Sequence, residues 1–169
     1  MSTRHTVLAT PIGELTVVRD DGGVTGVYFP HHWTRPDRSA FGPRVDDGFD
    51  DVAVQLAEYF AGDRREFDLP MHAAGDPVQE RVWRLIAAIP YGRTSTYGEL
   101  ADALHDGTTA QEVGAAVGSN PLSILVGCHR VVGAGGRLTG YAGGLPAKRH
   151  LLDLEAQHVE AQAQLALAW

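Results

Sequence analysis

The chain of 169 residues contains a single cysteine, Cys128, and the next two residues are His129 and Arg130. A thiol becomes a strong nucleophile as its thiolate, which needs a nearby base or positive charge, and these two neighbours are candidates for that role. Because successive side chains on a strand point to opposite faces, His129 can act on the thiol only across a turn or through a bridging water. A lone cysteine is also commonly a small buried apolar residue. The segment therefore allows either a reactive thiol or a structural one.

A carboxylate that orients the histidine would complete a relay to the thiol. Glu155 is one candidate among 21 acidic residues, and spacing does not select among them. With one cysteine the chain can form no intrachain disulfide and no multi-cysteine zinc site. Histidines at positions 31, 32 and 72 are more typical of solvated loops than of metal ligands. The sequence thus predicts no metal site.

Three helices are expected before the cysteine, each opened by a capping box. The boxes are 76–79, with a proline at the first helical position, 96–99 and 109–112. The second and third helices, joined by the turn Asp106-Gly107, have helix-turn-helix form, which by itself is a weak signal. The third helix is rich in glycine and alanine between 114 and 119. That composition fits either tight helix packing or a helix thin enough to enter a groove of DNA.

The first half of the chain reads as a small antiparallel sheet followed by a helix. Residues 6–9, 15–19 and 24–29 are rich in β-forming types, with turn residues between them. Apolar residues recur at helical spacing from 52 to 60, and Gly62 is a plausible stop. Residues 73–75 form the expected domain boundary. In the second half, 133–144 is a glycine-rich loop, 146–155 a helix, and 156–169 an alanine-rich tail of helical composition.

Composition and charge restrict the class of protein. No apolar stretch approaches the length of a membrane span, and the N-terminus lacks the apolar core of a secretory signal, so we expect a cytoplasmic protein without membrane contact. The net charge of −7 taken alone opposes nucleic-acid binding. Residues 1–75 carry 7 basic and 12 acidic side chains, whereas 76–155 carry 7 and 8. The second half is therefore neutral enough to meet a polyanion.

An ordered set of motifs makes the second half resemble the O6-alkylguanine-DNA alkyltransferase family. The matching stretches lie at 79–83, 89–92, 96–101, 113–116, 119–121, 128–132, 138–144 and 148–152. Their order and spacing fit throughout about 80 residues, which is far more specific than Cys-His-Arg-Val alone. The first half fits more loosely, through Pro-Ile-Gly-Glu-Leu at 11–15.

The resemblance implies a two-part fold of mixed α and β structure. Residues 1–75 would form a ribonuclease-H-like domain with a small sheet and a helix. Residues 76–155 would form a winged-helix-like domain that binds DNA and carries the active site, and 156–169 a C-terminal tail.

The resemblance also implies an activity: irreversible, single-turnover transfer of an alkyl group from O6 of guanine, or O4 of thymine, to Cys128. His129 would deprotonate the thiol through a water, and Glu155 would hold the imidazole. Tyr97 would donate a hydrogen bond or proton to the leaving guanine and help to rotate its phosphate, and Asn120 would brace the active-site strand. The partner would be double-stranded DNA containing O6-alkylguanine, bound by a monomer without cofactor or metal. The base would have to be flipped out of the duplex.

Further residues are carried over as contacts to DNA or to the flipped base. The third helix would enter the minor groove, backbone groups at Cys128 and Val131 would read the base, and the segment around Tyr141 would line the alkyl pocket. The expected contact residues are Thr96, Ala110, Gln111, Gly114, Ala115, Val131, Tyr141, Ala142 and Gly143.

Two positions depart from the family pattern. Gly127 stands where the family has proline, which would loosen the backbone beside the nucleophile. Gln111 stands where the family has an arginine finger, and the loss of charge and stacking plane predicts weaker binding or slower flipping. These departures keep open a sensor that binds the lesion without transfer. A thiol hydrolase or redox protein using Cys128 and His129 is a further alternative.

Overall fold

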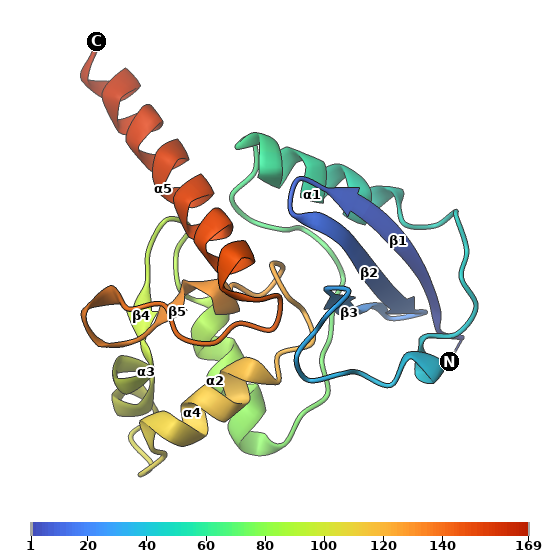
Figure 1. The fold of residues 1–169 in the computed structure, drawn as a ribbon, viewed down its shortest axis with the longest axis horizontal. Helices are drawn as coiled ribbons and strands as arrows, with labels where there is room; N and C mark the ends of the chain where they lie inside the picture. Colours follow the sequence, from blue (N-terminus) through green and yellow to red (C-terminus); the bar gives the residue numbers. More distant parts are fainter. Residues whose placement is uncertain (1, 169) are drawn as a thin grey trace.

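The computed structural model describes residues 2–168 and consists of two packed parts (Figure 1). The first is an antiparallel sheet of β1 (Arg4–Thr10), β2 (Gly13–Asp20) and β3 (Gly23–Tyr28), in the order β1-β2-β3. Helix α1 (Asp50–Ala61) covers one face of the sheet (Figure 1) and ends at Gly62 in a left-handed conformation. The strands and the helix that the sequence predicted are all present. The loop before α1 contains one short 3-10 helix, η1 (Arg38–Phe41).

The free edge of β3 joins the two parts. The amide of Val24 donates to the Pro70 carbonyl at 2.8 Å, and the amide of His72 donates back to the Val24 carbonyl at 3.0 Å. Further along, the amide of Val27 donates to the Pro121 carbonyl at 2.8 Å. Backbone groups at an open strand edge need partners, and here the linker and the second part supply them. The two parts therefore share one hydrophobic core.

The second part contains the three capped helices. They are α2 (Pro77–Ala87), α3 (Tyr97–Leu104) and α4 (Ala110–Gly118), and each starts with the capping box that the sequence predicted. A short parallel pair, β4 (Ser95–Thr96) with β5 (Val131–Val132), connects the start of α3 to the chain after the cysteine. The glycine-rich segment contains one 3-10 turn, η3 (Ala134–Gly136).

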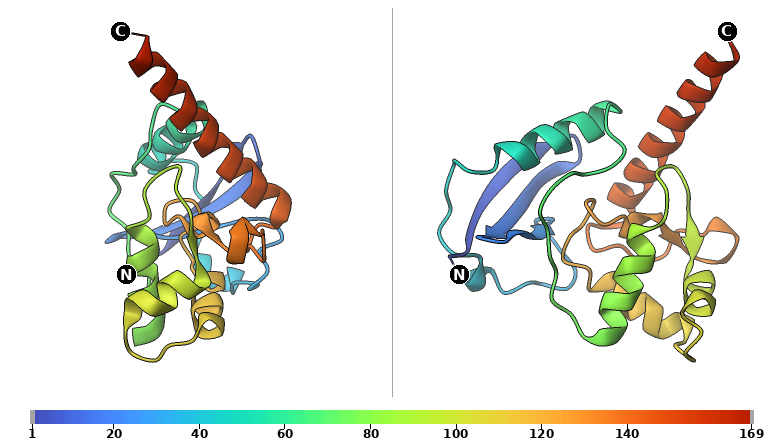
Figure 2. Two further views of the ribbon diagram at one scale, coloured as in Figure 1. Left: turned by 90° about the vertical axis from the view of Figure 1, so that its left-hand side faces the viewer. Right: turned by 180° about the vertical axis from the view of Figure 1, so that it is seen from behind.

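A single long helix, α5 (Leu145–Leu167), closes the chain. It passes from residue 155 to 156 without a break, so the predicted tail continues this helix, and Trp169 lies outside the described residues. Its middle packs on the chain after α1: the His158 ring lies against Gly62, and Arg65 donates to the Gln162 side chain. The C-terminal end projects away from the body (Figure 2). Among the helices of residues 2–168, none has the length and apolarity needed to cross a membrane.

Candidate functional site

The cysteine lies in a buried 3-10 turn, η2 (Cys128–Arg130). The amide of Cys128 donates to the Val126 carbonyl at 2.7 Å, and that of Arg130 donates to the Gly127 carbonyl at 2.9 Å. A 3-10 helix has three residues per turn, so consecutive side chains leave it in different directions. With three residues per turn, the thiol and the imidazole are about 120° apart around the turn, and not on opposite faces as they would be on a strand.

Glu155 of α5 is the centre of a buried cluster of polar groups behind the turn. Its Oε1 lies 2.8 Å from Nε2 of His129, and both side chains are fully buried. Arg130 donates to the same carboxylate through Nε, at 3.0 Å to Oε2, and through Nη2, at 2.8 Å to Oε1. The Tyr59 hydroxyl at 2.9 Å and the Gly92 amide at 3.2 Å complete the set. These five residues, Tyr59, Gly92, His129, Arg130 and Glu155, are called the Glu155 cluster below.

The protonation states in this cluster follow from its geometry. Burial raises the pKa of Glu155, but the hydrogen bonds from His129 and Arg130 outweigh it and lower the pKa to about 2. Burial lowers the pKa of His129. The pair is therefore a carboxylate and a neutral imidazole whose Nε2–H donates to Glu155. Nδ1 of His129 is buried and has no hydrogen-bond partner among residues 2–168, so its lone pair is free to act as a base.

The thiol itself is 4% exposed, and burial raises its pKa. The Asn120 side chain and the ammonium of Lys148 act in the opposite direction. Lys148 is buried, and its Nζ donates to the carbonyls of Val131, at 2.6 Å, and Thr139, at 2.9 Å. Burial lowers the pKa of Lys148 to about 8, against the effect of Cys128. Sequence reasoning did not assign a role to Lys148, although it is the chain's single lysine.

Cys128 opens into a cavity of about 230 Å³. This is smaller than the roughly 300–1,000 Å³ of pockets for drug-sized ligands, and its size suits a small planar group. Beside the sulfur it is lined by Trp33, Tyr97, Gly114, Val117, Gly118, Gly140, Tyr141 and Ala142. Four of these lining residues, Tyr97, Gly114, Tyr141 and Ala142, were predicted from the sequence. Trp33, which belongs to the first part of the fold, was not.

Tyr97 stands at the start of α3, directly after the capping residue Thr96. Its hydroxyl accepts a hydrogen bond from Thr139 Oγ1 at 3.3 Å. A phenol on the cavity wall with a long, weak partner of this kind remains able to donate its own proton to a ligand. The structure therefore brings the predicted acid and the predicted nucleophile to one cavity.

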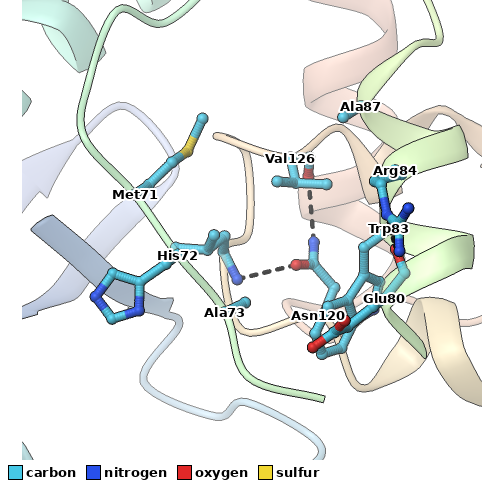
Figure 3. Close-up of a pocket in the computed structure, with 10 residues that line it drawn as sticks. Met71, His72, Ala73, Glu80, Trp83, Arg84, Ala87, Asn120 and Val126 are labelled. Carbon is cyan, nitrogen blue, oxygen red and sulfur yellow. Dashed lines mark hydrogen bonds between the residues drawn. The ribbon is translucent and has the colours of Figure 1, made fainter. Parts of the chain in front are cut away.

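Asn120 ties the turn to the end of α4. Its Nδ2 donates to the Val126 carbonyl at 3.3 Å, and its Oδ1 accepts from the Leu122 amide at 3.0 Å (Figure 3). The same Val126 carbonyl accepts the amide of Cys128. Asn120 thus holds the backbone that carries the thiol. Its side chain also borders a second cavity, of about 370 Å³, between Met71 and α2 (Figure 3).

Gly127 does not use the conformational freedom of glycine. Its φ is −72°, a value that proline also adopts. A Cβ at this position would lie 2.9 Å from Cδ of Arg130. The expectation that glycine loosens the backbone here stays a prediction, and the structure adds that a Cβ at this position would crowd the Arg130 side chain, which crosses toward Glu155.

Two residues that were expected to contact the flipped base, Val131 and Gly143, do not line the cavity. A Cβ on Gly143 would lie 2.6 Å from the Phe29 ring, so Gly143 packs against the first part of the fold. Val131 donates its amide to the Cys128 carbonyl and accepts Lys148 at its own carbonyl. Both backbone groups of Val131 thus already have partners within the chain.

Helix α4 separates its small residues between two faces. Val113, Ala116 and Val117 are buried, and the Ala116 carbonyl accepts the indole N–H of Trp83 at 2.8 Å. The opposite side consists of Ala110, Gln111 and Ala115, which are exposed, and Gly114, which is half-buried. Residues three and four apart share a helix face, so these four form one surface, called the outer face of α4 below. The small residues thus serve tight packing on one side and leave a slim surface on the other.

The fold and the site define a class of protein, one with a cysteine and a histidine–carboxylate pair in a buried turn beside a helix-turn-helix. The comparisons with known proteins agree. Sequence models of the 6-O-methylguanine DNA methyltransferase ribonuclease-like domain and DNA binding domain match residues 3–73 and 77–157. The chain belongs to the 6-O-methylguanine DNA methyltransferase family.

Individual relatives extend over nearly the whole chain. The methylated-DNA--protein-cysteine methyltransferase of Mycobacterium bovis is 42% identical, covering 95% of this chain and 97% of the relative. A crystal structure of the Mycobacterium tuberculosis O6-methylguanine methyltransferase matches with a TM-score of 0.84 at 40% identity, covering 92% of this chain and 94% of that one. A structure of the same organism's OGT in complex with DNA also has a TM-score of 0.84, at 41% identity and the same coverage. These similarities bear out the predicted two-part fold.

Proposed function

We propose that this protein repairs DNA by transferring a methyl or larger alkyl group from O6 of guanine to Cys128. The observation that carries the proposal is that Cys128 lines a cavity of about 230 Å³ and shares its 3-10 turn with His129, whose imidazole is hydrogen-bonded to Glu155. The names of the relatives describe the same type of reaction, methyl transfer from DNA to a protein cysteine. It needs no further cofactor.

The chemistry balances within the named residues. Nδ1 of His129 takes the thiol proton through a bridging water, and Glu155 stabilises the resulting imidazolium. The thiolate sulfur then forms a bond to the alkyl carbon while the bond from that carbon to O6 breaks. The electron pair stays on guanine, whose anion is neutralised by the Tyr97 hydroxyl proton. Because the thioether is stable, each molecule acts once.

The substrate we propose is duplex DNA containing O6-alkylguanine. A base inside the stack cannot reach the sulfur, so it must be flipped into the cavity. The outer face of α4 and the start of α3 at Thr96 would contact the minor groove, with Gln111 entering the stack in place of the flipped base. O4-alkylthymine is a possible second substrate class. We further propose a cytoplasmic monomer, with residues 76–155 acting on DNA, 1–75 supporting them, and 156–169 as an extension of α5.

Intact-mass measurement tests the proposal directly. Incubating the protein with a duplex that contains one O6-methylguanine should add one methyl group to the protein, at Cys128. The Cys128→Ala variant should bind the same duplex with unchanged mass. Matched duplex without the lesion should modify neither.

The alternative functions predict different outcomes. A lesion sensor would bind the methylated duplex tightly without any gain in mass, and it is disfavoured because Cys128 lines the cavity and the His129–Glu155 pair is formed. A thiol hydrolase or redox protein would turn over a thioester or peroxide and ignore the duplex. Either result would overturn the proposed transfer.

A further inference from the structure

Trp33 is a large aromatic residue that belongs to the first part of the fold and lines the Cys128 cavity of the second part. It lies in the loop between β3 and α1, and 59% of its surface is exposed. Exposed tryptophans are uncommon, because burying such a ring is strongly favourable. The exposed ring nevertheless lines the same cavity as Cys128 and Tyr97.

Two hydrogen bonds fix the position of Trp33. Its indole N–H donates to the carbonyl of Gly118, the last residue of α4, at 3.1 Å. Its backbone amide donates to the Ala142 carbonyl at 3.1 Å. The residue therefore bridges the end of α4 and the loop before α5, the two segments on either side of the cavity. Because its indole N–H and its backbone amide are both hydrogen-bonded, Trp33 holds its ring in a defined position on the cavity wall.

A glycine in α4 makes room for the indole. A Cβ on Gly118 would lie 2.6 Å from Cζ2 of the ring, closer than carbon atoms can approach, whereas one on Gly140 would lie at an ordinary contact distance of 3.8 Å from Cη2. Glycine inside a helix costs stability, so Gly118 has a packing reason: it lets the indole lie directly on the backbone of α4. The cavity ends where the ring begins.

We propose that Trp33 limits the size of the O6 substituent that the cavity accepts. The inference rests on the function proposed above and extends it to substrate range. The indole offers an apolar surface and keeps its single N–H engaged with Gly118, so it restricts volume without presenting a hydrogen bond to the ligand. A methyl group fits inside the present 230 Å³ together with the base. A benzyl group requires the space that the indole occupies.

The test compares two lesions in the wild-type protein and in Trp33→Ala and Trp33→Phe. Second-order rate constants for transfer are measured with duplexes carrying O6-methylguanine or O6-benzylguanine. Trp33→Ala should raise the benzyl-to-methyl ratio by about tenfold or more, the scale set by small volume changes in apolar pockets. Trp33→Phe keeps a smaller ring and should give an intermediate ratio. His31→Ala, an exposed neighbour in the same loop, should leave the ratio unchanged.

The inference fails if the ratio in Trp33→Ala stays within about twofold of the wild type. It also fails if both rates fall equally, because the ring would then bind the base without selecting the substituent. Thermal unfolding of each variant gives the folded fraction, to which the rates are normalised. A wild-type chain that modifies neither duplex would instead overturn the proposed function, so the two failures are distinguishable.

Discussion

The Glu155 cluster, to which Tyr59 of the first part contributes, and the outer face of α4 are built in opposite ways. In the cluster, one carboxylate accepts hydrogen bonds from four residues, and His129 and Glu155 are fully buried. On the outer face of α4, Ala110, Gln111 and Ala115 are exposed, and the two alanines offer no side-chain hydrogen-bonding group. The Glu155 cluster is held in place by its internal hydrogen bonds, whereas the outer face of α4 is accessible to a partner.

The difference separates two physical tasks. Proton transfer needs groups held at fixed distances in a site shielded from water, where electrostatic interactions are strong. A surface that enters a DNA groove needs small side chains and few hydrogen bonds within the protein, because its hydrogen-bond partners come from the duplex. Substitutions in the cluster should therefore affect chemistry and stability steeply. Substitutions on the outer face of α4 should change DNA affinity mildly and leave the chemistry intact.

The largest effect is expected from Glu155→Gln. Amide replacement leaves Arg130 without its counter-charge and converts one of the two accepting oxygens into an NH2 donor, so the side chain can no longer accept all the hydrogen bonds of the cluster. Transfer should slow by about 10²–10⁴-fold, and the free energy of unfolding should fall by roughly 3–5 kcal/mol. Single-turnover kinetics on folded protein and urea unfolding measure the two quantities.

Glu160→Gln, an exposed position on the same helix, is the matched control and should change neither quantity. If Glu155→Gln transferred within about tenfold of the wild-type rate, the cluster would be only structural, and the contrast between the two regions would break down.

The next effect is a loss of stability in acid. The pKa of Glu155 is about 2 in the folded protein against an ordinary 4.5, so its stabilisation is complete above pH 4.5 and is lost as pH falls toward 2. The lowered pKa of His129 acts in the same direction, starting below pH 6.5. The Glu155 contribution should be on the order of 3 kcal/mol.

Urea unfolding at pH 7, 4 and 3 measures this loss. Glu155→Gln should show a flatter pH dependence than the wild type. Parallel curves for the two proteins would place the acid sensitivity elsewhere in the molecule.

A smaller effect is expected from Ala115→Leu on the outer face of α4. The larger side chain thickens the surface that would enter the minor groove, so affinity for duplex DNA should fall by about tenfold. Transfer from the free base O6-methylguanine, which needs only the cavity, should be unchanged. Fluorescence anisotropy and intact-mass kinetics measure the two. Ala163→Leu, on the exposed end of α5, is the matched control; equal losses in both variants would count against a DNA-binding role for α4.

The smallest effect is expected from Gln111→Arg, which restores the family's usual residue. One added positive charge against phosphate should strengthen duplex binding by a few-fold near 0.1 M salt and steepen the salt dependence of log K by about 0.9. Anisotropy titrations at several salt concentrations measure the slope. Gln164→Arg on α5 adds the same charge at a distance and should not change it. An unaltered slope in Gln111→Arg would place position 111 outside the DNA contact.

Much of the fold could be predicted because its signals are local. Each capping box joins residues three apart in sequence, as in Thr109 and Glu112, and all three helix starts occur where they were expected. The alternating strands of the first half and the stop at Gly62 are local in the same sense. The continuous helix through residue 156 was less certain, because its exposed end has little apolar periodicity to mark it.

The candidate site was only partly predictable. Cys128 and His129 attracted interest by type and adjacency, and the motif resemblance supplied Tyr97 and Glu155. Arg130 was a candidate positive charge for the thiol, but the structure places its guanidinium on the carboxylate of Glu155, which it shares with His129. Lys148 and Trp33 were not predicted as site residues, because a lysine in a helix and a tryptophan in a loop are ordinarily surface residues.

The sequence by itself determined where helices and strands begin, which residue is the nucleophile candidate and, through its motifs, the family. Only the tertiary structure decided which of 21 acidic residues faces the imidazole, and that a loop of the first part supplies a wall of the cavity in the second. The physical reason is the separation along the chain over which each interaction acts. Caps and periodicity act within one or two turns of chain, whereas Tyr59, His129 and Glu155 meet across 96 residues, and such contacts exist only once the core has packed.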